Sequence, residues 1–245
     1  MNHFRVIRLL GLILLLAGVR FNCAAANDLF AAGKAAFESG QFADAAKNFR
    51  ADLETQPAVG TLLNLGLSEW RRGRAGAAIL AWEQASWLEP FDANVRTNLQ
   101  YARDFIGLEG PDYSWYERTS AWLPSNAWAW IAAGSLWLAV GMFVLPGVLR
   151  WRRSGWQQAL AALGLVLFLL SLPSNLGVLT RTNLGFVMQR DSALRLTPTS
   201  ESEVVTKLAA GEPARELRGR GEYILVKTSR GQGWIEKNQF GRISP

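Results

Sequence analysis

The sequence predicts a multidomain protein with a module of repeated α-helices, two membrane-spanning helices and a small all-β domain. Three observations support this fold class. Residues 26–91 repeat at a period of 33, two long stretches after them carry no charge, and the pattern from Gly185 onward changes to short alternating runs. Of the 245 residues, 49% are hydrophobic, and this high fraction is concentrated in the two uncharged stretches.

The repeat lies before the uncharged stretches. The segment LFAAGKAAFESGQFADAAKNFRADLETQP is followed by LLNLGLSEWRRGRAGAAILAWEQASWLEP, in which five residues with packing roles recur at one offset. Glycine and alanine let two antiparallel helices approach closely, an aromatic residue fills the space between them, and proline closes the second helix. The matched pairs are Gly33 with Gly66, Gly40 with Gly73, Ala45 with Ala78, Phe49 with Trp82, and Pro57 with Pro90.

This pattern resembles the tetratricopeptide repeat, although Asp52 stands where alanine is usual. Two repeats leave an apolar face uncovered, so we expect Asp92 to Ile106 to form a capping helix. The resemblance implies a five-helix module over residues 27–106 whose concave groove binds peptides of partner proteins. The family's inner-face positions fall on Lys34, Phe37, Asn64, Leu67, Trp70 and Tyr101. Alternatively, Phe37 and Trp70 complete the core, and Lys34 and Asn64 are simply solvated.

Two stretches are long enough to span a bilayer, which takes about 20 apolar residues in a helix. Residues 119–149 and 154–180 contain no charged side chain, and soluble cores seldom keep helices uncharged for so long. We predict a linker over 107–126 and spanning helices over 127–149 and 156–179. Pro173 leaves two possibilities open, a kink near the end of the second helix or an early exit from the hydrocarbon.

The N-terminus has the pattern of a secretory signal peptide over residues 1–26. Arg5 and Arg8 precede a short apolar core, and a run of alanines predicts cleavage after Ala26. Lipidation at Cys23 is a competing interpretation, but the residues before it are neither aliphatic nor small. Without cleavage, the segment would be a short anchor in the same orientation.

A basic loop over residues 150–155 predicts the topology. Arginines in short loops beside spanning helices stay in the cytoplasm, so Arg150, Arg152 and Arg153 determine the orientation of the hairpin. Both flanking segments would then lie outside the cytoplasm, in agreement with the signal peptide. We therefore expect a multi-pass protein of the bacterial inner membrane, with its N- and C-terminal domains on the periplasmic side.

The composition argues against an enzyme. His3 and Cys23 are the only histidine and cysteine, and both precede the predicted cleavage site. Nucleophiles and zinc sites built on these residues are therefore excluded from the mature chain, and we predict no catalytic residue, no metal and no cofactor. Residues 27–105 carry a net charge of −2 and residues 181–245 carry +4, which suits an ordinary solvated surface, lipid headgroups or anionic envelope polymers better than nucleic acid.

The C-terminal segment, residues 185–245, reads as five or six short strands between glycine-containing turns. Four features resemble the bacterial SH3-like domain: a strand and its following proline-containing turn over Leu194 to Ser200, the turn at Gly211, the run Tyr223 to Val226, and the final Gly233-Trp234-Ile235. Such domains often bind cell-wall peptides and often bind proteins, so the fold leaves this choice open. Trp234 fits the core of the barrel better than a ligand platform.

This order of segments resembles the BatE family, the tetratricopeptide proteins of the Bacteroides aerotolerance operon. The resemblance implies a non-enzymatic adaptor of the inner membrane, working with von Willebrand factor A membrane proteins and a MoxR-type ATPase in stress tolerance or envelope-protein assembly. The alternative is a peptidoglycan-binding anchor, in which the SH3-like domain holds the cell wall and the repeats recruit a hydrolase.

Overall fold

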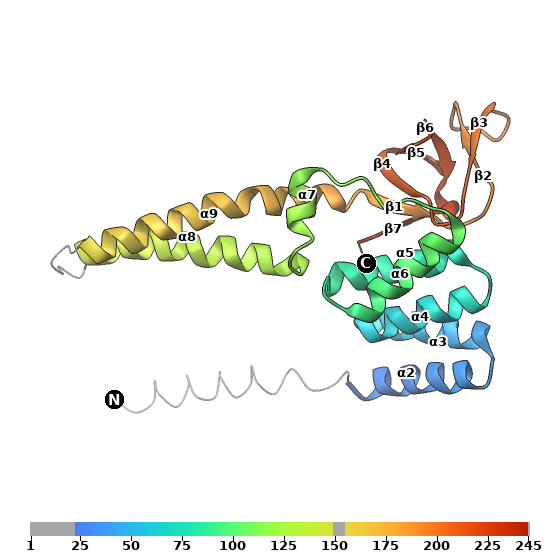
Figure 1. Ribbon diagram of the computed structural model, residues 1–245, viewed down its shortest axis with the longest axis horizontal. Coiled ribbons are helices and arrows are strands. Elements are labelled where there is room, and N and C mark those ends of the chain that lie inside the picture. Colours follow the sequence, from blue (N-terminus) through green and yellow to red (C-terminus); the bar gives the residue numbers. More distant parts are fainter. Residues whose placement is uncertain (1–22, 149–154, 245) are drawn as a thin grey trace.

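The first part of the chain forms two antiparallel helical hairpins and a further helix, in a computed structural model that describes residues 23–148 and 155–244 (Figure 1). Gly40 and Gly73 stand just after the first helix of each hairpin, with φ of 79° and 74°. Glycine adopts this left-handed conformation without strain, so each helix can end in a tight turn. The helices are α2 (Cys23–Glu38), α3 (Phe42–Thr55), α4 (Val59–Arg71), α5 (Ala75–Leu88) and α6 (Ala93–Ile106).

In each hairpin a glycine of the first helix lies against an aromatic ring of the second helix. The 33-residue period predicts that the two hairpins pack in the same way. A Cβ atom at Gly33 would lie 2.6 Å from the ring of Phe49, and one at Gly66 would lie 2.2 Å from Nε1 of Trp82. Real Cβ contacts are not so short, so only glycine lets these helices pack this closely. Helix α6 follows as the predicted cap, and the Asp92 side chain accepts hydrogen bonds from the first turn of α6.

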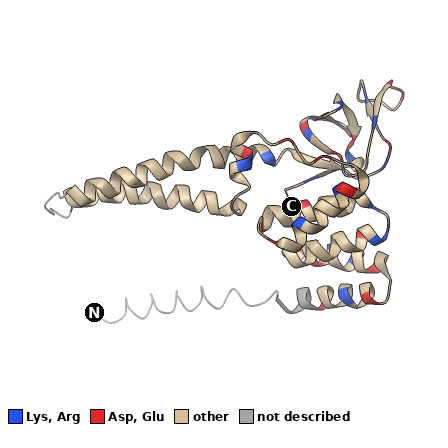
Figure 2. Cartoon of the chain, viewed as in Figure 1, with Lys and Arg blue, Asp and Glu red and all other residues tan. Residues whose placement is uncertain are grey.

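The two uncharged stretches form a long hairpin that projects from the body (Figure 1). Helices α8 (Ser125–Val148) and α9 (Gly155–Arg181) are each long and apolar enough to cross a membrane. At about 1.5 Å per residue they extend for about 36 and 40 Å, against about 30 Å of hydrocarbon. Within the described part of the hairpin, Arg181 is the only charged residue, and it is the last residue of α9. Figure 2 shows that the long arms of the hairpin carry no charged side chain.

The structure shows the path of the chain at Pro173, which the sequence left undecided, and a short helix that the sequence did not predict. Helix α9 continues through Pro173 to Arg181, so the second uncharged stretch is one continuous helix. The predicted linker contains a short helix, α7 (Trp115–Ser120), which packs against α9. The predicted signal residues 1–22 and the arginines of the loop, Arg150, Arg152 and Arg153, lie outside the described residues.

The C-terminal segment folds as a seven-stranded antiparallel sheet in the order β3-β2-β6-β5-β4-β1-β7. Sequence reasoning predicted five or six strands and missed β7, which pairs with β1. The strands are β1 (Leu184–Val187), β2 (Ser192–Arg195), β3 (Val204–Leu208), β4 (Pro213–Arg220), β5 (Tyr223–Thr228), β6 (Gly231–Glu236) and β7 (Phe240–Arg242). Leu208 of edge strand β3 and Val187 of β1 belong to one buried cluster, so the sheet curls around its own core.

The helical part and the sheet share a second core. Leu184 and Phe186 of β1, together with Ile243, belong to the same buried cluster as Ile79 and Trp82 of α5. The two parts also meet closely at the backbone, because a Cβ atom at Gly76 would lie 2.4 Å from the carbonyl oxygen of Val187. The sheet is therefore packed on α5 as one body with the helices.

Candidate partner-binding surface and buried charged junction

The six residues of the predicted groove lie on the first helix of each hairpin and on α6. Lys34 is exposed on α2, and Phe37 beside it is half-buried with its ring 5.3 Å from that of Phe42. On α4, Asn64 donates a hydrogen bond to the carbonyl oxygen of Gly60 at 2.8 Å. Leu67 and Trp70 of α4 are half-buried against the core, while Tyr101 of α6 is 57% exposed.

Three aromatic residues from α4 and α6 form a cluster, named here the aromatic surface, in which Trp70 is half-buried and Tyr101 and Phe105 are exposed. The ring of Trp70 lies 5.9 Å from Tyr101 and 5.7 Å from Phe105. Its other contact is the buried Trp82 at 6.0 Å, so Trp70 joins the core to the surface. Both sequence interpretations of Trp70 thus describe part of its surroundings, and of the predicted residues on α4 and α6 it is Trp70 and Tyr101 whose rings are in contact.

Phe105 was missed by sequence reasoning, although it is 72% exposed. The available signal was its spacing, since it stands four residues after Tyr101 and lies on the same face of α6. Lys34 and Phe37 lie on α2, one hairpin away, and none of the ring contacts described for this part of the chain joins them to the aromatic surface.

A charged junction lies where α9, α5, the α6–α7 connection and β4 meet. Arg181, the last residue of α9, is only 6% exposed. Its guanidinium carbon lies 4.7 Å from the ring centre of Trp87 and 5.2 Å from that of Tyr113, within the range of cation–π attraction. It also donates a hydrogen bond to Oγ of Ser120 at 3.3 Å. The end of the hairpin therefore packs against the helices of the body.

The buried Glu83 and the partly buried Tyr113 lie close to this arginine. Arg103 of α6 donates a hydrogen bond to the buried carboxylate of Glu83 on α5. Burial raises the pKa of Glu83 above its ordinary value, and the nearby Arg103 and Arg181 only partly oppose this effect. Burial also raises the pKa of Tyr113, to which the charge of Glu83 adds, so the phenol stays neutral at physiological pH.

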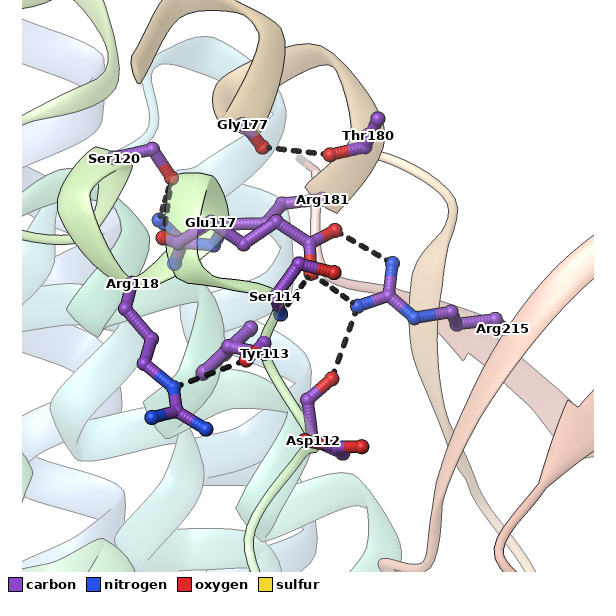
Figure 3. Close-up of polar contacts among 10 residues, drawn as sticks. All are labelled: Asp112, Tyr113, Ser114, Glu117, Arg118, Ser120, Gly177, Thr180, Arg181 and Arg215. Atoms are coloured by element: carbon purple, nitrogen blue, oxygen red, sulfur yellow. Dashed lines mark hydrogen bonds and ion pairs between the residues drawn. The ribbon is translucent and has the colours of Figure 1, made fainter. Parts of the chain in front are cut away.

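Glu117 connects α7 to the sheet. Its carboxylate is 1% exposed and accepts two hydrogen bonds from the Arg215 guanidinium of β4, at 2.7 and 2.6 Å (Figure 3). The Ser114 backbone N–H donates a third at 2.9 Å, as part of a capping box. Burial alone would raise the pKa of Glu117, but the hydrogen bonds from Arg215 and Ser114 outweigh it and lower the pKa.

The junction fixes three segments that are remote in sequence. Arg215 also donates to the Asp112 carbonyl oxygen at 3.2 Å, so one side chain of the sheet holds both the connection and α7 (Figure 3). Sequence reasoning assigned no role to these residues. The available signals were a glutamate inside an apolar helix, AILAWEQASW, and the arginine that ends the second uncharged stretch.

Comparison with known proteins gives no relative for this arrangement: the chain matches no family model, no curated protein and no solved structure. The function is therefore inferred from the geometry of the surface and the junction.

Proposed function

We propose that this chain is a non-enzymatic membrane adaptor, which presents a tetratricopeptide-like helical module and an SH3-like domain together outside the cytoplasm. The observation that carries the proposal is the aromatic surface. Trp70, Tyr101 and Phe105 have the composition of an interface centre, where aromatic side chains contribute most of the binding energy. The surface lies on the helical part, whose groove positions the sequence analysis assigned to partner binding.

Two helices that are long and apolar enough to cross a membrane support the role of a membrane adaptor. Ser125 begins α8 and Arg181 ends α9, and both lie at the body end of the hairpin (Figure 1). If the hairpin crosses a membrane, the helical part and the sheet must then lie on the same side of it. The shared core and the pair of Glu117 with Arg215 hold the two parts in a fixed relation, so a bound partner would be positioned relative to the bilayer.

The proposed cellular setting is a complex of the BatE type. A BatE-type complex with von Willebrand factor A membrane proteins and a MoxR-type ATPase would place the adaptor in stress tolerance or envelope-protein assembly. The periplasmic orientation rests on the arginine loop and the signal peptide of the sequence analysis.

The aromatic surface yields a direct test. We expect the double variant Tyr101→Ala and Phe105→Ala to reduce the crosslinking of protein partners in membranes by about tenfold or more, the effect of losing an interface hot spot. Both side chains are exposed, so the fold should be retained. Phe91→Ala is the matched control, because Phe91 is 66% exposed in the turn before α6.

The readouts are crosslinking in membranes and helicity by circular dichroism. Retained helicity with lost partners supports the proposal. If the double variant still crosslinked to the same partners as the wild type, the aromatic surface would be excluded as the partner-binding site. In that case, binding of the purified protein to sacculi would favour the cell-wall anchor instead.

The orientation of the hairpin is tested separately with alkaline phosphatase, which is active only outside the cytoplasm. We expect an active fusion after Pro245 and an inactive one after Ser154. Replacing Arg150, Arg152 and Arg153 by acidic residues should reduce the fraction of correctly inserted protein, because their positive charge opposes translocation. The reverse pattern, active at Ser154 and inactive at Pro245, would place both parts in the cytoplasm.

A further inference from the structure

The short helix α7 lies beside α9 at the body end of the hairpin (Figure 1). A Cβ atom at Gly177 of α9 would lie only 2.2 Å from the carbonyl oxygen of Tyr116. Nearby, Oγ of Ser174 donates a hydrogen bond to Oγ1 of Thr119 at 3.2 Å. Helix α7 is therefore packed closely against the last part of α9, residues 174–181.

The lengths of α8 and α9 place this contact relative to a bilayer. A helix crosses the hydrocarbon with about 20 residues, so a span counted from the loop end of the hairpin covers residues 155–174 of α9 and 129–148 of α8. The two counts agree with each other, because Nδ2 of Asn175 donates a hydrogen bond to the carbonyl oxygen of Trp128 at 3.2 Å. If the hairpin crosses a membrane, the hydrocarbon therefore ends at the level of these two residues.

Helix α7 lies at this same level. The carbonyl oxygen of Ser120, the last residue of α7, accepts a hydrogen bond from Nε1 of Trp128 at 3.0 Å. On the other arm of the hairpin, Thr119 is bonded to Ser174, where the counted span of α9 ends. Both arms thus hold α7 at the edge of the hydrocarbon, which is the depth of the lipid headgroups.

The two faces of α7 differ in what they contact. Glu117 and Ser120 are buried in the junction. Trp115 and Arg118, three residues apart, share another face of the helix, and Trp115 is 67% exposed. Figure 3 shows Arg118 on the side of α7 away from the sheet. In the turn that follows α7, Trp122 is 64% exposed.

These exposed side chains fit the headgroup layer of a membrane. Indole rings have an apolar body and a polar N–H, and tryptophan is enriched at the boundary between membrane and water. In the described chain, the Arg118 guanidinium uses only Nε, which donates to the Tyr113 carbonyl oxygen at 3.0 Å. Its other donors would be unsatisfied in hydrocarbon, whereas lipid phosphates can accept from them in the headgroup layer.

We propose that α7 and the turn after it lie in the headgroup layer of a phospholipid membrane, with Trp115 and Trp122 in contact with the lipids. The inference rests on the membrane hairpin of the proposed function, and it adds a second contact between the body and the bilayer. Because Glu117 on the buried face of α7 binds Arg215 of β4, this contact also fixes the sheet relative to the membrane. The aromatic surface on α4 and α6 takes no part in it.

The test is depth-dependent quenching of a fluorophore on the full chain, reconstituted into phosphatidylcholine vesicles. The fluorophore is attached to a single cysteine, introduced as Trp115→Cys or Trp122→Cys in a Cys23→Ser chain, because Cys23 is the only native cysteine. One set of vesicles carries a nitroxide on the lipid headgroup, and another carries it in the middle of the acyl chain. We expect the headgroup nitroxide to quench both labels about twofold or more strongly than the acyl-chain nitroxide does, as for groups at the interface.

Two further label sites calibrate the depth. Trp137 lies in the middle of α8 and is 74% exposed, so a label at Trp137→Cys should be quenched mainly by the acyl-chain nitroxide. Leu196 follows β2, in a part of the sheet far from the hairpin (Figure 1), and is 61% exposed. A label at Leu196→Cys should be quenched by neither nitroxide. All four side chains are exposed, so we expect circular dichroism to show the same fold in each labelled chain.

The calibration sites separate failure of this proposal from failure of the membrane hairpin. Suppose that the label at residue 137 is quenched from the acyl chain, but those at 115 and 122 are quenched by neither nitroxide. The hairpin would then span the membrane with α7 outside it, and the proposal for α7 would be wrong. Stronger quenching of 115 and 122 from the acyl chain would also refute it, since α7 would lie in the hydrocarbon. An unquenched label at 137 would refute the membrane hairpin itself and, with it, this inference.

Discussion

Replacing Glu117 by alanine is expected to lower the free energy of unfolding by about 3 kcal/mol. The change removes the carboxylate that accepts both hydrogen bonds of Arg215 and leaves this guanidinium without its counter-charge. Breaking a buried ion pair costs about 3–5 kcal/mol, and the partial exposure of Arg215 places this pair at the lower end. For a chain of this size, we expect the thermal midpoint in detergent to fall by about 6–12 °C.

The control for this variant is Glu222→Ala. Glu222 is exposed beside β5, and none of the ion pairs described for the folded chain involves its side chain, so we expect a change within about 0.5 kcal/mol. A double-mutant cycle with Arg215→Met separates the pair from the rest of the junction. Equal midpoints for Glu117→Ala and Glu222→Ala would show that the junction does not stabilise the fold.

Comparison of Glu117→Ala with the wild type also measures how the stabilising effect of Glu117 depends on pH. The pKa of Glu117 is lowered in the folded chain, which therefore binds fewer protons at this group than the unfolded chain does. Its stabilising effect is fully present above the ordinary carboxyl pKa of 4.5 and is lost as the pH falls through the lowered value. The difference in midpoint between the wild type and Glu117→Ala should therefore shrink on acidification. The raised pKa of Glu83 acts in the opposite sense in both proteins and cancels in the difference.

The elements that the sequence predicted have either a periodic or a compositional signal. The 33-residue repeat predicted a close approach of two helices in each hairpin with an aromatic residue between them, and the structure adds that Gly33 lies against Phe49 and Gly66 against Trp82. The uncharged stretches correspond to α8 and α9, since a long apolar helix is visible in composition alone. Strand β7 has only three residues, too few for an alternating pattern, and its place depends on pairing with β1 and on packing of Gly241 against Leu80 of α5.

The junction could not be predicted for a different reason. Glu117 and Arg215 are 98 residues apart, and Arg181 meets Ser120 across 61 residues, so no local pattern connects them. The contact of Glu117 with Arg215 forms only when β4 lies beside α7, and the contact of Arg181 with Ser120 forms only when α7 packs against α9. In the aromatic surface, by contrast, Trp70 and Tyr101 followed from the repeat register, and only Phe105 lay outside the family's inner-face positions.

Packing between α4 and α5 yields the second large effect, which is expected for Gly66→Leu. A Cβ atom at this position would lie 2.2 Å from Nε1 of Trp82, a side chain that is 1% exposed and has no free space to enter. Displacing the indole also breaks its hydrogen bond to the Leu63 carbonyl oxygen at 3.2 Å. Overpacking of this kind costs about 1–3 kcal/mol, and occasionally more where a large ring is trapped, so we expect about 3 kcal/mol or more.

The matched control is Gly60→Leu on the same helix. A Cβ atom at Gly60 has no neighbour within 4 Å, and leucine is a better helix former than glycine, so we expect no loss and a gain of up to about 1 kcal/mol. Thermal melting of the full chain by circular dichroism is the measurement, because Trp82 belongs to a core that includes Leu184, Phe186 and Ile243. In a fragment without the sheet these side chains would be missing, and the thermal midpoint of every variant would be lower than in the full chain. If Gly66→Leu melted at the same temperature as Gly60→Leu, the close approach of α4 to Trp82 would be refuted, and with it the register of the repeat.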